Sequence, residues 1–160
     1  MIKFASLSCI LATVAFGLAG PAQASPAGLN AAMMLPITRF VAATNADRAS
    51  GFDGYFTDDA VVVDNFAPYE WTTANAGHRW WSEFRALRAK IHFGNIHVAA
   101  QPITQFTLSA FGAYVVVPLE ISFTIMGKPH RQTGLQVFTL RLVGTEWKIA
   151  TATWGTLTRN

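Results

Sequence analysis

The segment from Tyr114 to Met126 constrains the fold more than any other part of the chain. Its apolar residues alternate with other residues, as they do in a strand with one buried face. That face carries Val115, Val117, Leu119, Ile121, Phe123 and Ile125. The opposite face is mixed and carries Tyr114, Val116, Pro118, Glu120, Ser122 and Thr124. The alternation therefore predicts a strand of a sheet that covers a hydrophobic core.

Three other β-prone segments accompany this strand in the second half of the chain. Residues with turn chemistry separate them, around 110–113, 127–129 and 144–145. The pattern predicts antiparallel strands over 96–107, 114–126, 130–143 and 147–156.

The first half of the mature chain has helical spacing instead. We expect a first helix over 31–45, a short second helix at 52–56, and a strand over 60–66. A third helix is expected after Asn75, which can cap it, and Gly94 is expected to end it. Three helices followed by a meandering sheet indicate an α+β fold, in which the helices pack on a curved antiparallel sheet around an apolar cavity.

The first 24 residues have the pattern of a secretory signal peptide. Lys3 precedes an apolar stretch over 4–19, and Ala22-Gln23-Ala24 supplies a small-x-small cleavage pattern. The apolar stretch is shorter than the ~20 residues of a membrane span. We therefore expect cleavage after Ala24, a periplasmic or secreted protein, and one mature domain over 25–160.

Composition excludes several kinds of function for this mature domain. The one cysteine of the full sequence, Cys9, lies in the leader, so neither disulfides nor thiol catalysis is expected of the mature domain. The formal net charge of +3 includes Lys3, and no block of basic residues indicates a nucleic acid or a membrane as partner. The four histidines are scattered without metal-ligand spacing, so we predict no metal site and no cofactor.

A motif near the middle of the chain carries a more specific resemblance. Phe56-Thr57-Asp58-Asp59-Ala60 leads into three valines and Asp64, the paired Trp80-Trp81 follows on a helix, and Glu146-Trp147-Lys148-Ile149 opens the last strand. This order resembles the SnoaL-like, nuclear transport factor 2-like superfamily over the whole mature chain. The resemblance implies the fold expected above. It implies no single activity, because the fold carries isomerases, dehydratases, hydrolases and binding modules.

Ketosteroid isomerase is the nearest chemical template in that superfamily. The resemblance places Asp64 at the position of its general base, where apolar neighbours would raise the pKa of the carboxyl. An alternative is that Asp64 only caps the end of the strand. The phenol donor of the template falls on Phe40, and its second donor falls near Gln136, where there is no acid. Steroid isomerisation by that mechanism is therefore disfavoured.

Aromatic side chains make any cavity of this fold apolar and suited to a flat hydrophobic molecule. We take as candidate ligand-binding residues Phe40, Tyr55, Trp71, Trp81, Phe84, Phe123, Gln136 and Trp154.

Two functions remain open at this point. The favoured one is an exported ligand-binding or accessory domain for a small hydrophobic molecule. The alternative is a small isomerase or dehydratase that uses Asp64 as its general acid or base. We also expect a homodimer through the outer sheet face, around Val116, Pro118 and Glu120.

Overall fold

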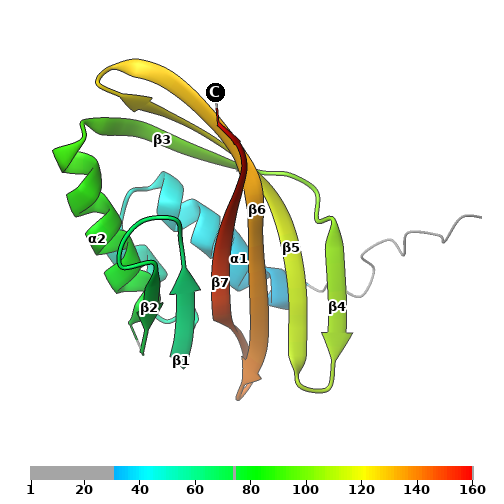
Figure 1. Cartoon of the computed structure of the whole chain (residues 1–160). Helices are drawn as coiled ribbons and strands as arrows, with labels where there is room; N and C mark the ends of the chain where they lie inside the picture. The colour runs from blue at the N-terminus through cyan, green and yellow to red at the C-terminus, as the bar shows by residue number, and fades with distance from the viewer. Residues whose placement is uncertain (1–30, 74, 160) are drawn as a thin grey trace, which may run out of the picture.

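A computed structural model describes residues 31–73 and 75–159, and the predicted signal peptide lies outside these residues. A mixed, curved seven-stranded sheet has two α-helices on one of its sides (Figure 1). The helices are α1 (Ala31–Asn45) and α2 (Ala76–Lys90), with a 3-10 turn η1 (Ala49–Phe52) between them. The strands are β1 (Phe56–Val63), β2 (Glu70–Thr72), β3 (Phe93–Ala100), β4 (Gln105–Ser109), β5 (Gly112–Ile125), β6 (Lys128–Val143) and β7 (Glu146–Arg159).

The order of the strands brings the two halves of the chain into one sheet. It is β2-β1-β7-β6-β5-β3, with β4 paired to the other end of β5. Strands β5, β6 and β7 form a long antiparallel meander, and β1 joins it parallel to β7. The predicted fully antiparallel sheet is therefore wrong at one pairing. The residue pattern of a single strand does not report the direction of a partner that lies far away in sequence.

The predicted short second helix is also wrong, so the described part of the chain has two α-helices rather than three. Phe52 and Phe56 have helical spacing, but Gly54 lies between them with φ +80°, a conformation that ends a helix. Phe52 closes the 3-10 turn instead, and Phe56 is already the first residue of β1.

Strand β5 confirms the alternation read from the sequence. Val115, Val117, Leu119 and Phe123 are buried, and Glu120 on the opposite face is exposed. The segment 96–107, however, forms two strands. Pro102 has no backbone N–H to donate, and it lies in the break between β3 and β4.

Polar contacts join α1 to the sheet and α2 to the end of α1. The Asn45 side chain, at the end of α1, pairs with the backbone of Val98 in β3: its Nδ2 donates to the carbonyl at 2.9 Å, and its Oδ1 accepts from the N–H at 2.7 Å. Arg88 of α2 is buried and donates to Asp47, just beyond α1, at 3.0 Å. The first contact joins α1 to the sheet, and the second joins α2 to the end of α1.

None of the helices in the described part of the chain is long and apolar enough to cross a membrane.

Candidate functional site

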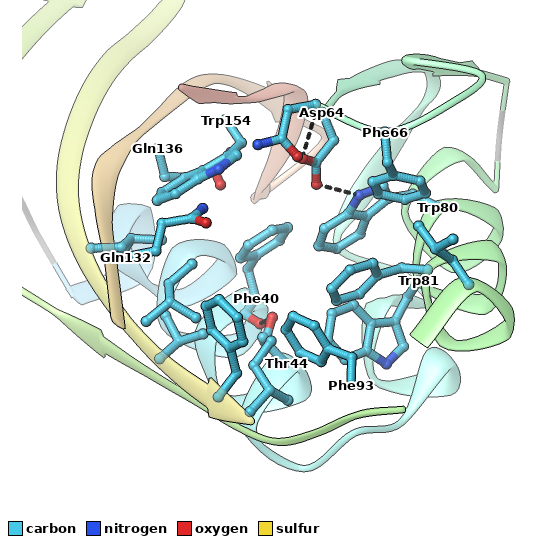
Figure 2. A pocket seen from close by; sticks show the side chains of 18 of the residues that line it. Phe40, Thr44, Asp64, Phe66, Trp80, Trp81, Phe93, Gln132, Gln136 and Trp154 are labelled. Atoms are coloured by element: carbon cyan, nitrogen blue, oxygen red, sulfur yellow. Dashed lines mark hydrogen bonds between the residues drawn. The ribbon is translucent and has the colours of Figure 1, made fainter. Parts of the chain in front are cut away.

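A pocket of about 260 Å³ lies between the two helices and the inner face of the sheet (Figure 2). Apolar and aromatic side chains form most of its lining, because the buried faces of β3, β5 and α2 meet here. The polar residues that line it are Thr44, Asp64, Asn65, Gln132 and Gln136. Asp64 is the only charged residue among the described residues of the lining.

Asp64 directly follows β1, and its carboxylate lies against the pocket. One oxygen accepts the N–H of Asn65 at 2.6 Å, and the other accepts the indole N–H of Trp80 at 2.8 Å (Figure 2). Burial among apolar groups raises the pKa of the Asp64 carboxyl, and the two donors counter this only in part. The carboxylate thus accepts one backbone N–H, as the capping alternative expects, and it also lines a cavity, which the general-base hypothesis requires.

The indole of Trp154 forms the wall beside Asp64. Val63 of β1 pairs with Thr153 of β7, so Asp64 lies next to Trp154, and Trp154 pairs in turn with Gln136 of β6. Asp64, Trp154 and Gln136 therefore form one row across three strands. Gly134 of β6 leaves room for the indole, because a Cβ at this position would overlap the ring.

A shared hydroxyl fixes the polar groups at one edge of this wall. The Thr156 Oγ1 lies 2.9 Å from Asn65 Nδ2, 3.2 Å from Gln132 Nε2 and 3.1 Å from the indole nitrogen of Trp154. Gln136, by contrast, is only 5% exposed, and within the described segments its amide has no hydrogen-bond partner. Of the three amides that line the pocket, those of Asn65 and Gln132 are therefore held by Thr156, and that of Gln136 is available to a ligand.

Most of the predicted ligand-binding residues line this one pocket. They are Phe40, Trp81, Phe84, Phe123, Gln136 and Trp154. The candidate base Asp64 lines it as well.

Tyr55 and Trp71 lie elsewhere. The Tyr55 ring is covered by the guanidinium of Arg39, 4.6 Å from its centroid. Trp71 is buried in β2, and its indole N–H donates to Glu83 at 2.8 Å. Neither is among the residues that line the pocket, so a role in ligand binding gains no support for these two.

The sequence reasoning missed two contributors to the site. Gln132 precedes Gln136 by four residues on the same strand, so the period of two already puts both amides on one face. Trp80 enters the sequence reasoning only through the Trp80-Trp81 pair of the family motif, but its indole N–H donates to Asp64. No pattern in the sequence indicates that second contact, because it joins the end of β1 to the face of α2.

The histidines do not form a metal site in the part of the chain that the structure describes. No group of three or more histidine, cysteine or acidic side chains is close enough there to hold an ion. His78 pairs with Asp53 at 2.9 Å, and His130 stacks on Phe123.

The fold occurs in solved structures of diverse proteins. A hexachlorocyclohexane dehydrochlorinase (LinA, type 2) superposes with a TM-score of 0.70 at 7% identity, over 81% of this chain and 86% of that one. A ketosteroid isomerase-like protein from Erwinia carotovora atroseptica gives 0.63 at 17%, over 80% and 95%. A cystatin-like-fold protein of unknown function from Nostoc punctiforme gives 0.61 at 9%, over 79% and 89%. At these identities the likeness shows a shared fold and no shared activity.

No curated protein matches the chain. The sequence does match the SnoaL-like domain family over residues 37–147, from α1 into the start of β7. This match covers more than half of the chain and nearly all of the elements that enclose the pocket. The chain therefore belongs to the SnoaL-like domain family.

Proposed function

We propose that the protein is exported and that its domain binds a small, uncharged and mainly apolar molecule. The observation that carries this proposal is the pocket of about 260 Å³, with its aromatic walls and its few polar groups. An apolar cavity of about 150 Å³ is large enough for benzene. The pocket therefore has room for a ring with substituents.

The charges around the pocket support an uncharged ligand. The described lining contains no lysine, arginine or histidine that could pair with an anion. An ionised Asp64 would repel a carboxylate or phosphate held at close range in so apolar a site. A ligand with a hydrogen-bond donor fits this environment better.

We expect 4-ethylphenol to bind to the protein with a measurable heat in calorimetric titration. Ile121→Trp places a larger side chain in the pocket and should abolish this binding. Leu157→Trp makes the same kind of change at a position that is 64% exposed and should leave the affinity unchanged. The anionic analogue 4-hydroxybenzoate should bind more weakly than 4-ethylphenol.

The result would contradict the proposal if Ile121→Trp and Leu157→Trp bound 4-ethylphenol as well as the unchanged protein does. The compound would then sit outside the pocket. Absence of any heat with the unchanged protein would count against the pocket as a binding site for compounds of this size.

Proton-transfer catalysis is the second candidate function. The specific observation in its favour is Asp64, a carboxylate that faces an apolar pocket and whose pKa is raised by burial. Such a group is suited to take a proton from a bound substrate near neutral pH. The aromatic side chain of Phe40 and the amide of Gln136 offer no acidic partner for it.

We also propose that the domain forms a homodimer through the outer face of the sheet. Pro118 and Leu135 pair on that face and are only partly buried, whereas both helices cover the other face. Val116, named from the sequence, is already buried within the single chain, and Glu120 is exposed.

Sedimentation should give the mass of a dimer, and Leu135→Lys should shift that mass toward the monomer. A monomer at all concentrations would refute this interface.

A further inference from the structure

The Gln136 amide is the feature of the pocket that the proposed function leaves unexplained. The residue lies on the inner face of β6 between the buried residues Gly134 and Phe138. Its side chain is buried and reaches the pocket, yet no described group of the protein pairs with it. A ligand in the pocket that pairs with this amide would therefore gain a hydrogen bond in a mainly apolar site.

The neighbouring amide of Gln132 has a different role. It is directed to the Thr156 hydroxyl, which also receives the indole N–H of Trp154. Gln132 therefore belongs to the wall of the pocket. Gln136 is the amide that is free to recognise a ligand.

Gln136 and Asp64 lie on opposite sides of Trp154, so together they would contact two opposite edges of one ligand. The two residues are separated by one strand, β7, which places their backbones about 10 Å apart. The indole of Trp154 lies between them on the same face of the sheet. A flat ring that rests against this indole would have one edge toward Asp64 and the opposite edge toward Gln136 (Figure 2).

The chemistry of the two ends differs. The Asp64 carboxylate has accepted one N–H on each oxygen and has lone pairs left for another donor. The Gln136 amide can donate its N–H groups to an oxygen. We propose that the pocket selects an uncharged ring compound that carries a hydroxyl group for Asp64 on one edge and a carbonyl oxygen for Gln136 on the other. This inference rests on the proposed function and adds the class of ligand.

A matched pair of probes tests the carbonyl contact. The probes are 4-hydroxyacetophenone, which has both polar edges, and 4-ethylphenol, which lacks the carbonyl oxygen. Gln136→Leu removes the amide at similar side-chain size. It should weaken binding of 4-hydroxyacetophenone about three- to tenfold and change the affinity for 4-ethylphenol by less than about twofold, as the loss of one hydrogen bond requires.

Gln132→Leu is the matched control on the same strand and face. This substitution disturbs the wall of the pocket but removes no contact to the carbonyl oxygen of the ligand. It should therefore alter the affinities for 4-hydroxyacetophenone and 4-ethylphenol by the same factor. Thermal unfolding establishes that each variant is folded, and Gln136→Met replaces the leucine variant if that one does not fold.

The outcomes separate this inference from the proposed function. If neither probe binds the unchanged protein, the proposed function fails, and the ligand class fails with it. If both bind and Gln136→Leu weakens both equally, or weakens neither, the pocket stands as a binding site but the assigned carbonyl contact is overturned.

Discussion

Phe40→Ala is expected to lower the free energy of unfolding by about 3–5 kcal/mol. Phe40 is 4% exposed and lies at the centre of the aromatic core. Its ring stacks on Trp80 with a centroid distance of 5.4 Å, and it meets Phe52 and Phe138 edge-on at 5.4 and 5.3 Å. Truncation would leave a cavity that these large, mutually packed rings cannot close. Chemical denaturation measures the loss.

Phe111→Ala is the matched control, because Phe111 is 92% exposed at the tip of the β4–β5 hairpin. It should change the stability by less than about 0.5 kcal/mol. Equal effects of the two substitutions would refute the placement of Phe40 at the centre of the core. The milder Phe40→Leu keeps more of the buried volume and provides a folded variant with a larger pocket.

Asp64→Asn is expected to abolish proton transfer if the domain is an enzyme. The ketone 2-indanone has acidic C–H groups and a size suited to the pocket, and NMR in heavy water follows the exchange of its methylene protons. A positioned general base accelerates such a step about 10²- to 10⁴-fold. The unchanged protein should therefore accelerate the exchange, and the asparagine variant should return it to the buffer rate. Exchange at the buffer rate with the unchanged protein would argue for the binding function alone.

The same substitution has a stability effect that depends on pH. Because burial raises the pKa of Asp64 in the folded state, the folded protein holds this proton more tightly than the unfolded chain does. Asp64 therefore favours folding most at pH below about 4, and that contribution is lost as the pH rises through the pKa of the folded state. The asparagine variant has no such loss. It has only one acceptor oxygen for the N–H groups of Asn65 and Trp80, which costs about 1–2 kcal/mol relative to the ionised carboxylate.

Denaturation curves of both proteins over a series of pH values measure this difference. The advantage of the unchanged protein should be largest in acid and should shrink as the pH increases. A difference that stays constant with pH would mean that the carboxyl is not perturbed by burial. Such a result would leave Asp64 with a capping role alone.

The buried faces of the long strands can be predicted from the residue pattern alone. In β5 the period of two is set by backbone geometry, so the alternation of Val115, Val117 and Leu119 specifies the inner face without knowledge of the partners. The same period of two puts Gln132, Gln136 and Phe138 on one face of β6. The family motif around Asp64 is also a local pattern, and it predicted the fold.

Local residue patterns gave wrong predictions for the second helix and for two of the ligand-binding residues. The aromatic spacing at Phe52 and Phe56 is helical, yet the conformation of Gly54 directs the chain into a strand. Tyr55 and Trp71 are aromatic like the true pocket residues, but Arg39 and Glu83 hold them elsewhere. Composition thus indicated that aromatic side chains line the pocket, but it did not indicate which aromatic residues do so.

The assembly of the site, by contrast, depends on how distant segments of the chain pack together. The insertion of β7 between β1 and β6 brings Asp64, Trp154 and Gln136 into one row, although they come from distant parts of the chain. Trp80 then reaches Asp64 from α2. Periodicity fixes the face on which a side chain lies, because it follows from the local backbone. Which strands become neighbours depends on how distant segments jointly bury their apolar faces, and that is a property of the whole packed chain.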